Sequence, residues 1–252
     1  MKIAGLSDRG MVRKNNQDLY AYRELDGFTI GVVCDGMGGA AAGNKASALA
    51  IKKILKNSIS QIKEKLSSED VRSVLRSAIR KANADVYDKA ASYKGYEGMG
   101  TTAVGFVYMN SKERAFFVNV GDSRAYIMRA GELTQITNDH SLVYEMVAKG
   151  HITKEEARIH PNRNIITRAI GTDEELHPDT FEVDIMRGDM ILLCSDGLTS
   201  MMSDEEILSI LVTGQSVEKM AAELVNRANM AGGADNVTVL LAVFDSEGRT
   251  SA

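Results

Sequence analysis

The sequence has few prolines and cysteines and lacks any long hydrophobic run. Only two of its 252 residues are proline and 44% are hydrophobic, a composition typical of a folded globular chain. Cys34 and Cys194 lie in apolar stretches without metal-type spacing, so we expect buried, reduced thiols and no disulfide framework. No window approaches the roughly 18 apolar residues of a membrane span, and the amino terminus has no signal-peptide-length apolar run. We therefore expect a cytoplasmic protein with no membrane contact.

An excess of positive charge is also missing. The 30 lysines and arginines are outnumbered by 34 aspartates and glutamates, which gives a formal charge of −4 at pH 7. Surfaces that bind nucleic acid usually carry the opposite balance, so we expect no nucleic-acid partner. No linker, repeat or low-complexity tract divides the chain. We expect a single domain over residues 1–252 and a monomer.

The order of predicted elements indicates an α+β fold with antiparallel sheets. Apolar runs between turn signals predict the strands, helical spacing predicts the helices, and the pair Asp26-Gly27 predicts a hairpin. Groups of strands alternate with pairs of helices, which does not fit the strand-helix alternation of a parallel sheet. Strands are predicted at 2–7, 18–23, 28–35, 101–109, 114–120, 124–129, 132–136, 180–184, 190–195 and 236–244, and helices at 44–59, after Ser67, at 204–211 and at 217–229.

The segment 141–171 has a different pattern. Short helical pieces are predicted at 142–149 and at 153–158, and a polar stretch follows them. Such a long excursion from a sheet is typical of a functional loop, so we expect a mobile flap, a candidate lid.

Aspartates recur at the edges of the predicted strands. Each one alone is more readily explained as a turn or capping residue, so the interpretation depends on their convergence. A buried carboxylate is costly unless a cation or hydrogen bonds compensate it, and several together indicate a cation site. Oxygen ligands favour Mg²⁺ or Mn²⁺, because zinc prefers histidine or cysteine. Asp35, Asp122 and Asp196 follow apolar strands, whereas Asp18 and Asp235 stand just before strands.

Two such cations a few ångströms apart acidify a shared water and hold phosphoryl oxygens, which predicts hydrolysis of a phosphate ester. Arg13, five residues before Asp18, is then a candidate for binding the phosphate. We interpret His140 as a hydrogen-bonding residue rather than a catalyst. Thr101 and Thr102 are interpreted as strand residues whose hydroxyls satisfy nearby polar groups.

Competing motifs fail on their sequence context. Gly36, Gly38 and Ala41 match a loose dinucleotide fingerprint, but no acidic residue and no second parallel strand follow at the required distance. Asn44 replaces the lysine of a phosphate-binding loop. Neither cysteine is followed by the arginine that a cysteine-dependent phosphatase requires, and no Ser/His/Asp order indicates a hydrolase triad.

Seven short motifs follow one another along the chain: RKNNQD (13–18), VCDGMGG (33–39), MGTT (99–102), NVGDSR (119–124), DHS (139–141), LCSDGL (193–198) and DNVTV (235–239). Together they resemble the PPM, or type 2C, protein phosphatase family in its compact bacterial form. The resemblance spans nearly the whole chain and implies a four-layer αββα sandwich with the flap at 141–171. It also implies a metal-dependent protein serine/threonine phosphatase that acts by direct attack of a metal-activated water, without a phosphoenzyme.

The resemblance also implies partners and site roles. The substrates would be phosphorylated proteins, and the setting would be reversal of a bacterial Ser/Thr kinase. The resemblance implies two Mn²⁺ or Mg²⁺ ions in the core site, with a weaker third. In this assignment Asp35 would bridge the first and second metals. Asp196 and Asp235 would complete the first metal's ligands, while the Gly36 carbonyl would bind the second metal and Asp18 would reach it through water. Asp122 and Asp196 would share the third metal, and Arg13 would bind the phosphate.

Two departures from the family pattern leave alternatives open. Ala40 stands where bacterial members usually carry a histidine that is a proposed proton donor, so a metal-bound water or His140 would have to replace it. Gln17 stands where the family often has glutamate, which weakens the second metal site. The alternatives are a catalytically weakened phosphoprotein-binding module and a phosphatase of small phosphoesters.

Overall fold

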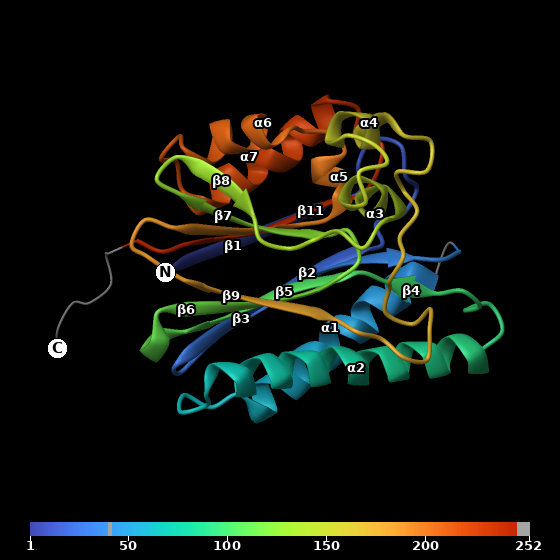
Figure 1. The fold of residues 1–252 in the computed structure, drawn as a ribbon, viewed down its shortest axis with the longest axis horizontal. Helices are drawn as coiled ribbons and strands as arrows, with labels where there is room; N and C mark the ends of the chain where they lie inside the picture. Colours follow the sequence, from blue (N-terminus) through green and yellow to red (C-terminus); the bar gives the residue numbers. More distant parts are fainter. Residues whose placement is uncertain (40–41, 246–252) are drawn as a thin grey trace.

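Two antiparallel β-sheets pack face to face between two layers of helices (Figure 1). The computed structural model describes residues 1–39 and 42–245. This arrangement confirms the α+β class and the four-layer sandwich. None of the described helices is both long enough and apolar enough to cross a bilayer.

Each sheet is assembled from strands that lie far apart in the sequence. The first has the order β1-β11-β10-β7-β8, and the second has the order β2-β3-β5-β6-β9, with the short β4 paired to β3. Every ladder between these strands is antiparallel. The strands are β1 (Lys2–Asp8), β2 (Asp18–Leu25), β3 (Phe28–Met37), β4 (Gly100–Thr101), β5 (Ala103–Met109), β6 (Arg114–Val120), β7 (Arg124–Arg129), β8 (Glu132–Gln135), β9 (Asp179–Asp184), β10 (Met190–Cys194) and β11 (Val237–Val243).

Helices cover the outer face of each sheet. α1 (Ala42–Gln61) and α2 (Ser68–Ser92) lie on the second sheet, whereas α6 (Asp204–Leu211) and α7 (Val217–Met230) lie on the first (Figure 1). The predicted start of α2 is confirmed, because Ser67 and Asp70 form a capping box.

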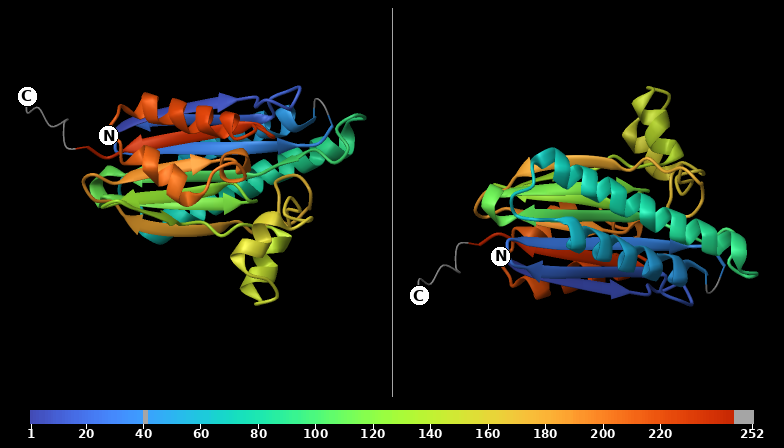
Figure 2. Two further views of the ribbon diagram at one scale, coloured as in Figure 1. Left: turned by 90° about the horizontal axis from the view of Figure 1, so that it is seen from above. Right: turned by 90° about the horizontal axis from the view of Figure 1, so that it is seen from below.

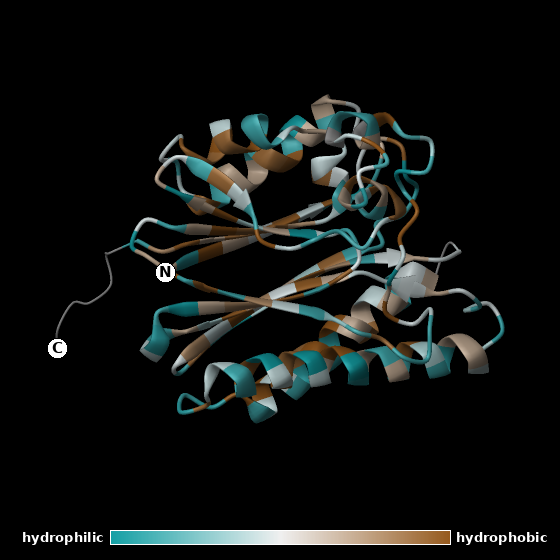
Figure 3. Cartoon of the chain, in the orientation of Figure 1, coloured by the Kyte–Doolittle hydropathy of each residue, from teal (hydrophilic) through white to brown (hydrophobic). Residues whose placement is uncertain are grey.

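The hydrophobic core has three layers, one between the sheets and one under each helical layer. Val33, Phe106 and Leu240 belong to the central layer, and all three are nearly inaccessible to solvent. Figure 3 shows hydrophobic residues along the strands and on the helix faces that meet them. Burying one such side chain contributes about 1.5–3 kcal/mol, so the sheets form a rigid support for the loops at their ends.

The chain between β8 and β9 leaves the sandwich and contains two short helices. These are α3 (Leu142–Ala148) and α4 (Lys154–Ile159), which project from the body in Figure 2. An isolated bridge between Ser141 and Ile166 closes the base of the excursion. The helices and the Thr153/Glu156 capping box were predicted from the sequence, and the structure confirms them.

Other predictions need correction in detail. The strand predicted at 101–109 is divided at Thr102 into β4 and β5. Thr101 still pairs with β3, but on its other side it pairs with Ile170, whereas β5 pairs with β6. Asp35 does not end its strand, since β3 continues to Met37 through pairing with β4. Two short helices escaped prediction, the 3-10 turn η1 (Asn110–Lys112) and α5 (Asp196–Thr199), because each is too short to show a period.

Candidate active site

A cavity of about 220 Å³ lies where the two sheets and the 141–171 segment meet. Asn164 and Ile166 of that segment line one part of it. Asp18 does not line the cavity: it lies behind it, 6% exposed, and its Oδ2 accepts a hydrogen bond from Ser195 Oγ (2.6 Å). The other predicted site residues all line the cavity: Arg13, Asp35, Gly36, Asp122, Asp196 and Asp235.

The backbone of Asp35 is held by two threonines. Thr102 N–H and Thr101 Oγ1 both donate to the Asp35 carbonyl (2.8 Å each), and Asp35 N–H donates to Thr102 Oγ1 (2.9 Å). Thr102 Oγ1 also contacts Ser123 Oγ (2.8 Å), next to Asp122. The hydroxyls of both threonines thus satisfy nearby polar groups, as expected, although only Thr101 belongs to a strand and Thr102 lies between β4 and β5. These contacts fix the backbone position from which the Asp35 carboxylate extends.

Gly36 is required by close packing. A Cβ atom at this position would lie 2.3 Å from the carbonyl oxygen of Gly43, at the start of α1. Gly36 N–H donates to Gln17 O (3.2 Å), and Gln17 Nε2 donates to Gly39 O (3.3 Å). Gln17 therefore joins the Arg13 loop to the turn after β3. Ala40, the other departure, lies outside the described residues.

The aspartates at the cavity are electrostatically unsatisfied. Burial raises the pKa of Asp35 well above its usual range, and repulsion from the neighbouring aspartates adds to the effect. Burial likewise raises the pKa of Asp18 to about 6 and of Asp122 to about 8, and it raises the pKa of Asp196. Asp18 Oδ1 and Asp196 Oδ1 are buried without a hydrogen-bond partner. A divalent cation among these carboxylates would offset both the burial and the repulsion.

The donor set suits a hard cation in its chemistry, since it consists of carboxylate and carbonyl oxygens. Among the described residues, no three His, Cys, Asp or Glu side chains are arranged as a metal-binding group. One carboxylate is engaged by a cationic side chain, because Arg13 Nη2 donates to Asp235 Oδ2 (2.6 Å). The carboxylate and carbonyl oxygens therefore suit a divalent cation in their chemistry, and they line one cavity. In this structure the Asp235 carboxylate is held by Arg13.

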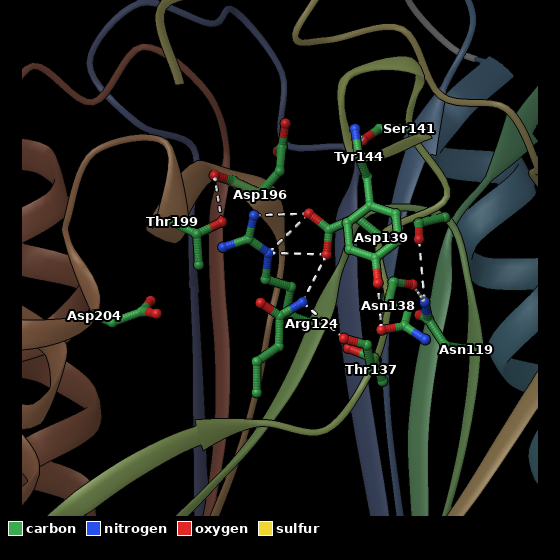
Figure 4. Close-up of polar contacts among 12 residues, drawn as sticks. Asn119, Arg124, Thr137, Asn138, Asp139, Ser141, Tyr144, Asp196, Thr199 and Asp204 are labelled. Atoms are coloured by element: carbon green, nitrogen blue, oxygen red, sulfur yellow. Dashed lines mark hydrogen bonds and ion pairs between the residues drawn. The ribbon is translucent and has the colours of Figure 1, made fainter. Parts of the chain in front are cut away.

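A partly buried ion pair beside the site was not predicted (Figure 4). Arg124 Nε and Nη2 both donate to the carboxylate of Asp139, with an Nη2–Oδ2 distance of 2.7 Å. Arg124 also lowers the pKa of Asp122 and of Asp196, against the larger effect of burial. Both residues lie in motifs named above, NVGDSR and DHS, so the sequence marked each of them. Their pairing could not be read from it, because only the fold shows that β7 brings Arg124 to the residues before α3.

His140 is a structural residue and does not line the cavity. It is buried, and burial lowers its pKa, which favours the neutral imidazole. Nδ1 accepts the N–H of Gly121 (3.1 Å), so the ring proton lies on Nε2, which faces Asp179 Oδ2 (3.1 Å). The interpretation of His140 as a hydrogen-bonding residue agrees with this geometry, whereas its alternative role as proton donor does not.

Comparison with known proteins gives a consistent result. The profile of the family described as Protein phosphatase 2C matches residues 5–237. A serine/threonine phosphatase of Listeria welshimeri is 39% identical over 236 residues, which cover 93% of this chain and 92% of that protein. The Streptococcus agalactiae serine/threonine phosphatase structure superimposes with a TM-score of 0.89 at 35% identity, covering 97% of this chain and 99% of that one.

A further solved structure includes metal ions. It is the catalytic domain of the serine threonine protein phosphatase PstP in complex with two manganese ions, with a TM-score of 0.80 and 36% identity, and it covers 97% of this chain and 98% of that one. The profile match and the near-complete relatives agree with the observed fold. The chain therefore belongs to the protein phosphatase 2C family and is a protein serine/threonine phosphatase.

Proposed function

We propose that the protein hydrolyses phosphoserine and phosphothreonine in proteins in a metal-dependent reaction, by direct attack of water and without a phosphoenzyme. One observation carries this proposal: carboxylates with raised pKa values surround the same cavity as an arginine. When bound, two divalent cations supply Lewis-acid polarisation of the phosphoryl oxygens and a more acidic water. The two manganese ions of the PstP structure support Mn²⁺, and the all-oxygen donor set is equally suited to Mg²⁺.

The aspartates would divide the cations between them. Asp35 is repelled by each of the four other candidate aspartates, which come from both sheets. A carboxylate close to all the others suits a ligand that bridges two ions. Asp196 and Asp235, the carboxylates from the first sheet, would complete the first ion with Asp35, and the Gly36 carbonyl would face the second. Asp18, set behind the cavity, would act through water, and Asp122 would hold a weaker third ion with Asp196.

Arg13 would bind the phosphate. Its side chain is 55% exposed, so the guanidinium can meet a phosphoryl group that enters from solvent. A guanidinium binds two phosphoryl oxygens at once, which orients the phosphorus toward the aspartates. We assign no proton-donor role to His140, since both ring nitrogens are engaged away from the cavity.

The biological setting follows from the family and remains part of the proposal. The substrates would be phosphoproteins, including those of a bacterial Ser/Thr kinase, in the cytoplasm. The chain would act as a monomeric single domain, residues 1–252, with segment 141–171 as its flap. Asn164 and Ile166 line the cavity, which supports a role for this segment in substrate contact.

The test is hydrolysis of a phosphothreonine peptide. We expect phosphate release with Mn²⁺, none after chelation, and a loss of at least about 100-fold in Asp35→Asn. Asp88→Asn, an exposed change on α2 with the same loss of charge, serves as the control and should retain full activity. Folded, Mn²⁺-treated protein that binds the peptide without releasing phosphate would instead establish the phosphoprotein-binding alternative.

A further inference from the structure

The loop that carries Arg13 has no regular structure of its own. It runs from the end of β1 at Asp8 to the start of β2 at Asp18, and it joins the two sheets. The Arg13 side chain is more than half exposed and contacts Asp235 at its tip. Its position relative to the aspartates therefore depends on how the backbone of this loop is anchored.

One buried side chain anchors this loop at three points. Asn236, which is 5% exposed, uses all of its carboxamide on this loop. Its Nδ2 donates to the carbonyl oxygens of Arg9 (2.8 Å) and Asn15 (2.9 Å). Its Oδ1 accepts the N–H of Gln17 (2.8 Å). The three contacts bracket Arg13 on both sides.

Backbone contacts seat the same loop against residues 233–235. Met11 N–H donates to Gly233 O (2.8 Å). Gly10 has a φ of +78°, and a Cβ atom there would lie 2.1 Å from Asp235 O, so only glycine permits this approach. The loop thus rests on the segment that carries Asp235, with Asn236 as its side-chain anchor.

No other residue type reproduces this pattern at the same length. A carboxamide offers one acceptor and two donors in one plane, whereas a carboxylate only accepts and a hydroxyl has a single donor. Losing these contacts leaves two carbonyls and one N–H without their partners and releases the loop on both sides of Arg13.

We propose that Asn236 is a positioning residue for phosphate binding, which holds Arg13 at the cavity by fixing the backbone of its loop. This inference rests on the proposed function, in which Arg13 grips the phosphoryl group. Asn236 lines the cavity, but the polar atoms of its side chain are engaged by the loop, so in this scheme its effect passes through Arg13.

The test compares Asn236→Ser with a matched variant, Asn83→Ser. Asn83 is buried on α2, and it makes the same pattern of contacts elsewhere: Nδ2 donates to Asp173 O (2.8 Å) and Glu174 O (3.1 Å), and Oδ1 accepts Gly171 N–H (2.7 Å). Both changes are neutral and remove three hydrogen bonds to backbone. Asn83→Ser therefore reports the effect of losing three such bonds away from the Arg13 loop, at the end of segment 141–171.

For Asn236→Ser with saturating Mn²⁺, we expect KM for the phosphothreonine peptide to rise about tenfold to 100-fold. We expect kcat and the Mn²⁺ affinity measured by calorimetry to change less than about threefold, because the aspartates stay in place. In an Arg13→Ala background the same change should alter kcat/KM less than about twofold. An equal loss with and without Arg13, or an equal rise in KM for Asn83→Ser, would overturn the proposal.

Two readouts do not require activity. Hydrogen exchange at the Met11 and Gln17 amides should accelerate in Asn236→Ser and stay unchanged in Asn83→Ser. Inorganic phosphate should bind Mn²⁺-loaded Asn236→Ser more weakly, as it binds Arg13→Ala. If wild-type protein released no phosphate, the proposed function would fail while exchange and phosphate binding still decided the role of Asn236. If Asn236→Ser does not fold, Asn236→Gln replaces it, because glutamine keeps the donors and the acceptor on a longer side chain. Unchanged hydrogen exchange at the Met11 and Gln17 amides in Asn236→Gln would count against the proposal.

Discussion

Replacing Asp18 with asparagine should stabilise the metal-free protein at neutral pH. Asp18 is almost fully buried, and burial raises its pKa from 3.8 to about 6. An acid with a raised pKa in the folded state binds protons more tightly there than in the unfolded chain. Its ionisation therefore lowers the stability as the pH rises from about 4 to about 6, and the loss is complete above that window.

The magnitude follows from the same values. The difference between 3.8 and about 6 corresponds to about 3 kcal/mol, at about 1.4 kcal/mol for each pKa unit. Asparagine removes the charge and keeps the acceptor for Ser195 Oγ. Its Nδ2 takes the place of Asp18 Oδ1, which is buried without a hydrogen-bond partner, so the exchange sacrifices no existing bond there.

The assay is urea unfolding of chelator-treated protein at several pH values. We expect Asp18→Asn to exceed wild type by about 3 kcal/mol at pH 7.5 and by nearly nothing at pH 4. Asp88→Asn removes an exposed charge and should change the stability by less than about 0.5 kcal/mol. The reasoning is refuted if Asp18→Asn is no more stable at pH 7.5, or if its advantage does not shrink toward pH 4.

Two further predictions concern the ion pair and the thiols. Asp139→Asn should lower the free energy of unfolding by about 2–3 kcal/mol in the same assay. This loss is smaller than that expected on breaking a fully buried ion pair, because the Arg124 side chain remains 27% exposed. An unchanged free energy of unfolding would mean that water alone solvates Arg124 well enough. Burial raises the pKa of Cys194 to about 12 and of Cys34 further, so a thiol reagent such as Ellman's should label both only as the protein unfolds, and rapid labelling of native protein would contradict this.

Local signals in the sequence predicted most of the elements. The Asp26-Gly27 hairpin is confirmed by the pairing of Leu25 with Phe28, and the capping box predicted the start of α2 within a residue. These features depend on contacts between residues that lie close together in the chain, which short patterns record. The strand-edge aspartates were recognisable for a related reason, since a charge beside an apolar run is visible without the fold.

Long-range contacts at the same site were not predictable. Asn236 binds Arg9 and Gln17, more than 200 positions away, and nothing in the neighbourhood of either residue marks the contact. The pair Arg124 and Asp139 spans a shorter separation but crosses from β7 to the residues before α3. Such contacts depend on which strands become neighbours, and the hydrophobic pattern fixes the face of a strand without naming its partner.

The division of the site between the sheets connects catalysis to stability. Asp18 and Asp35 lie on β2 and β3 of the second sheet, whereas Asp196 and Asp235 flank β10 and β11 of the first, and Asp122 lies in the turn that joins β6 of the second sheet to β7 of the first. Their mutual repulsion, which adds to burial in raising the pKa of Asp35, opposes close approach of the two sheet edges. A cation shared by Asp35 and Asp196 would attract both edges, so the charge that weakens the metal-free sandwich would become a cross-link between its halves. Mass action then requires that the stability gained from Mn²⁺ depend on carboxylates of both sheets, and removing either set should abolish the gain.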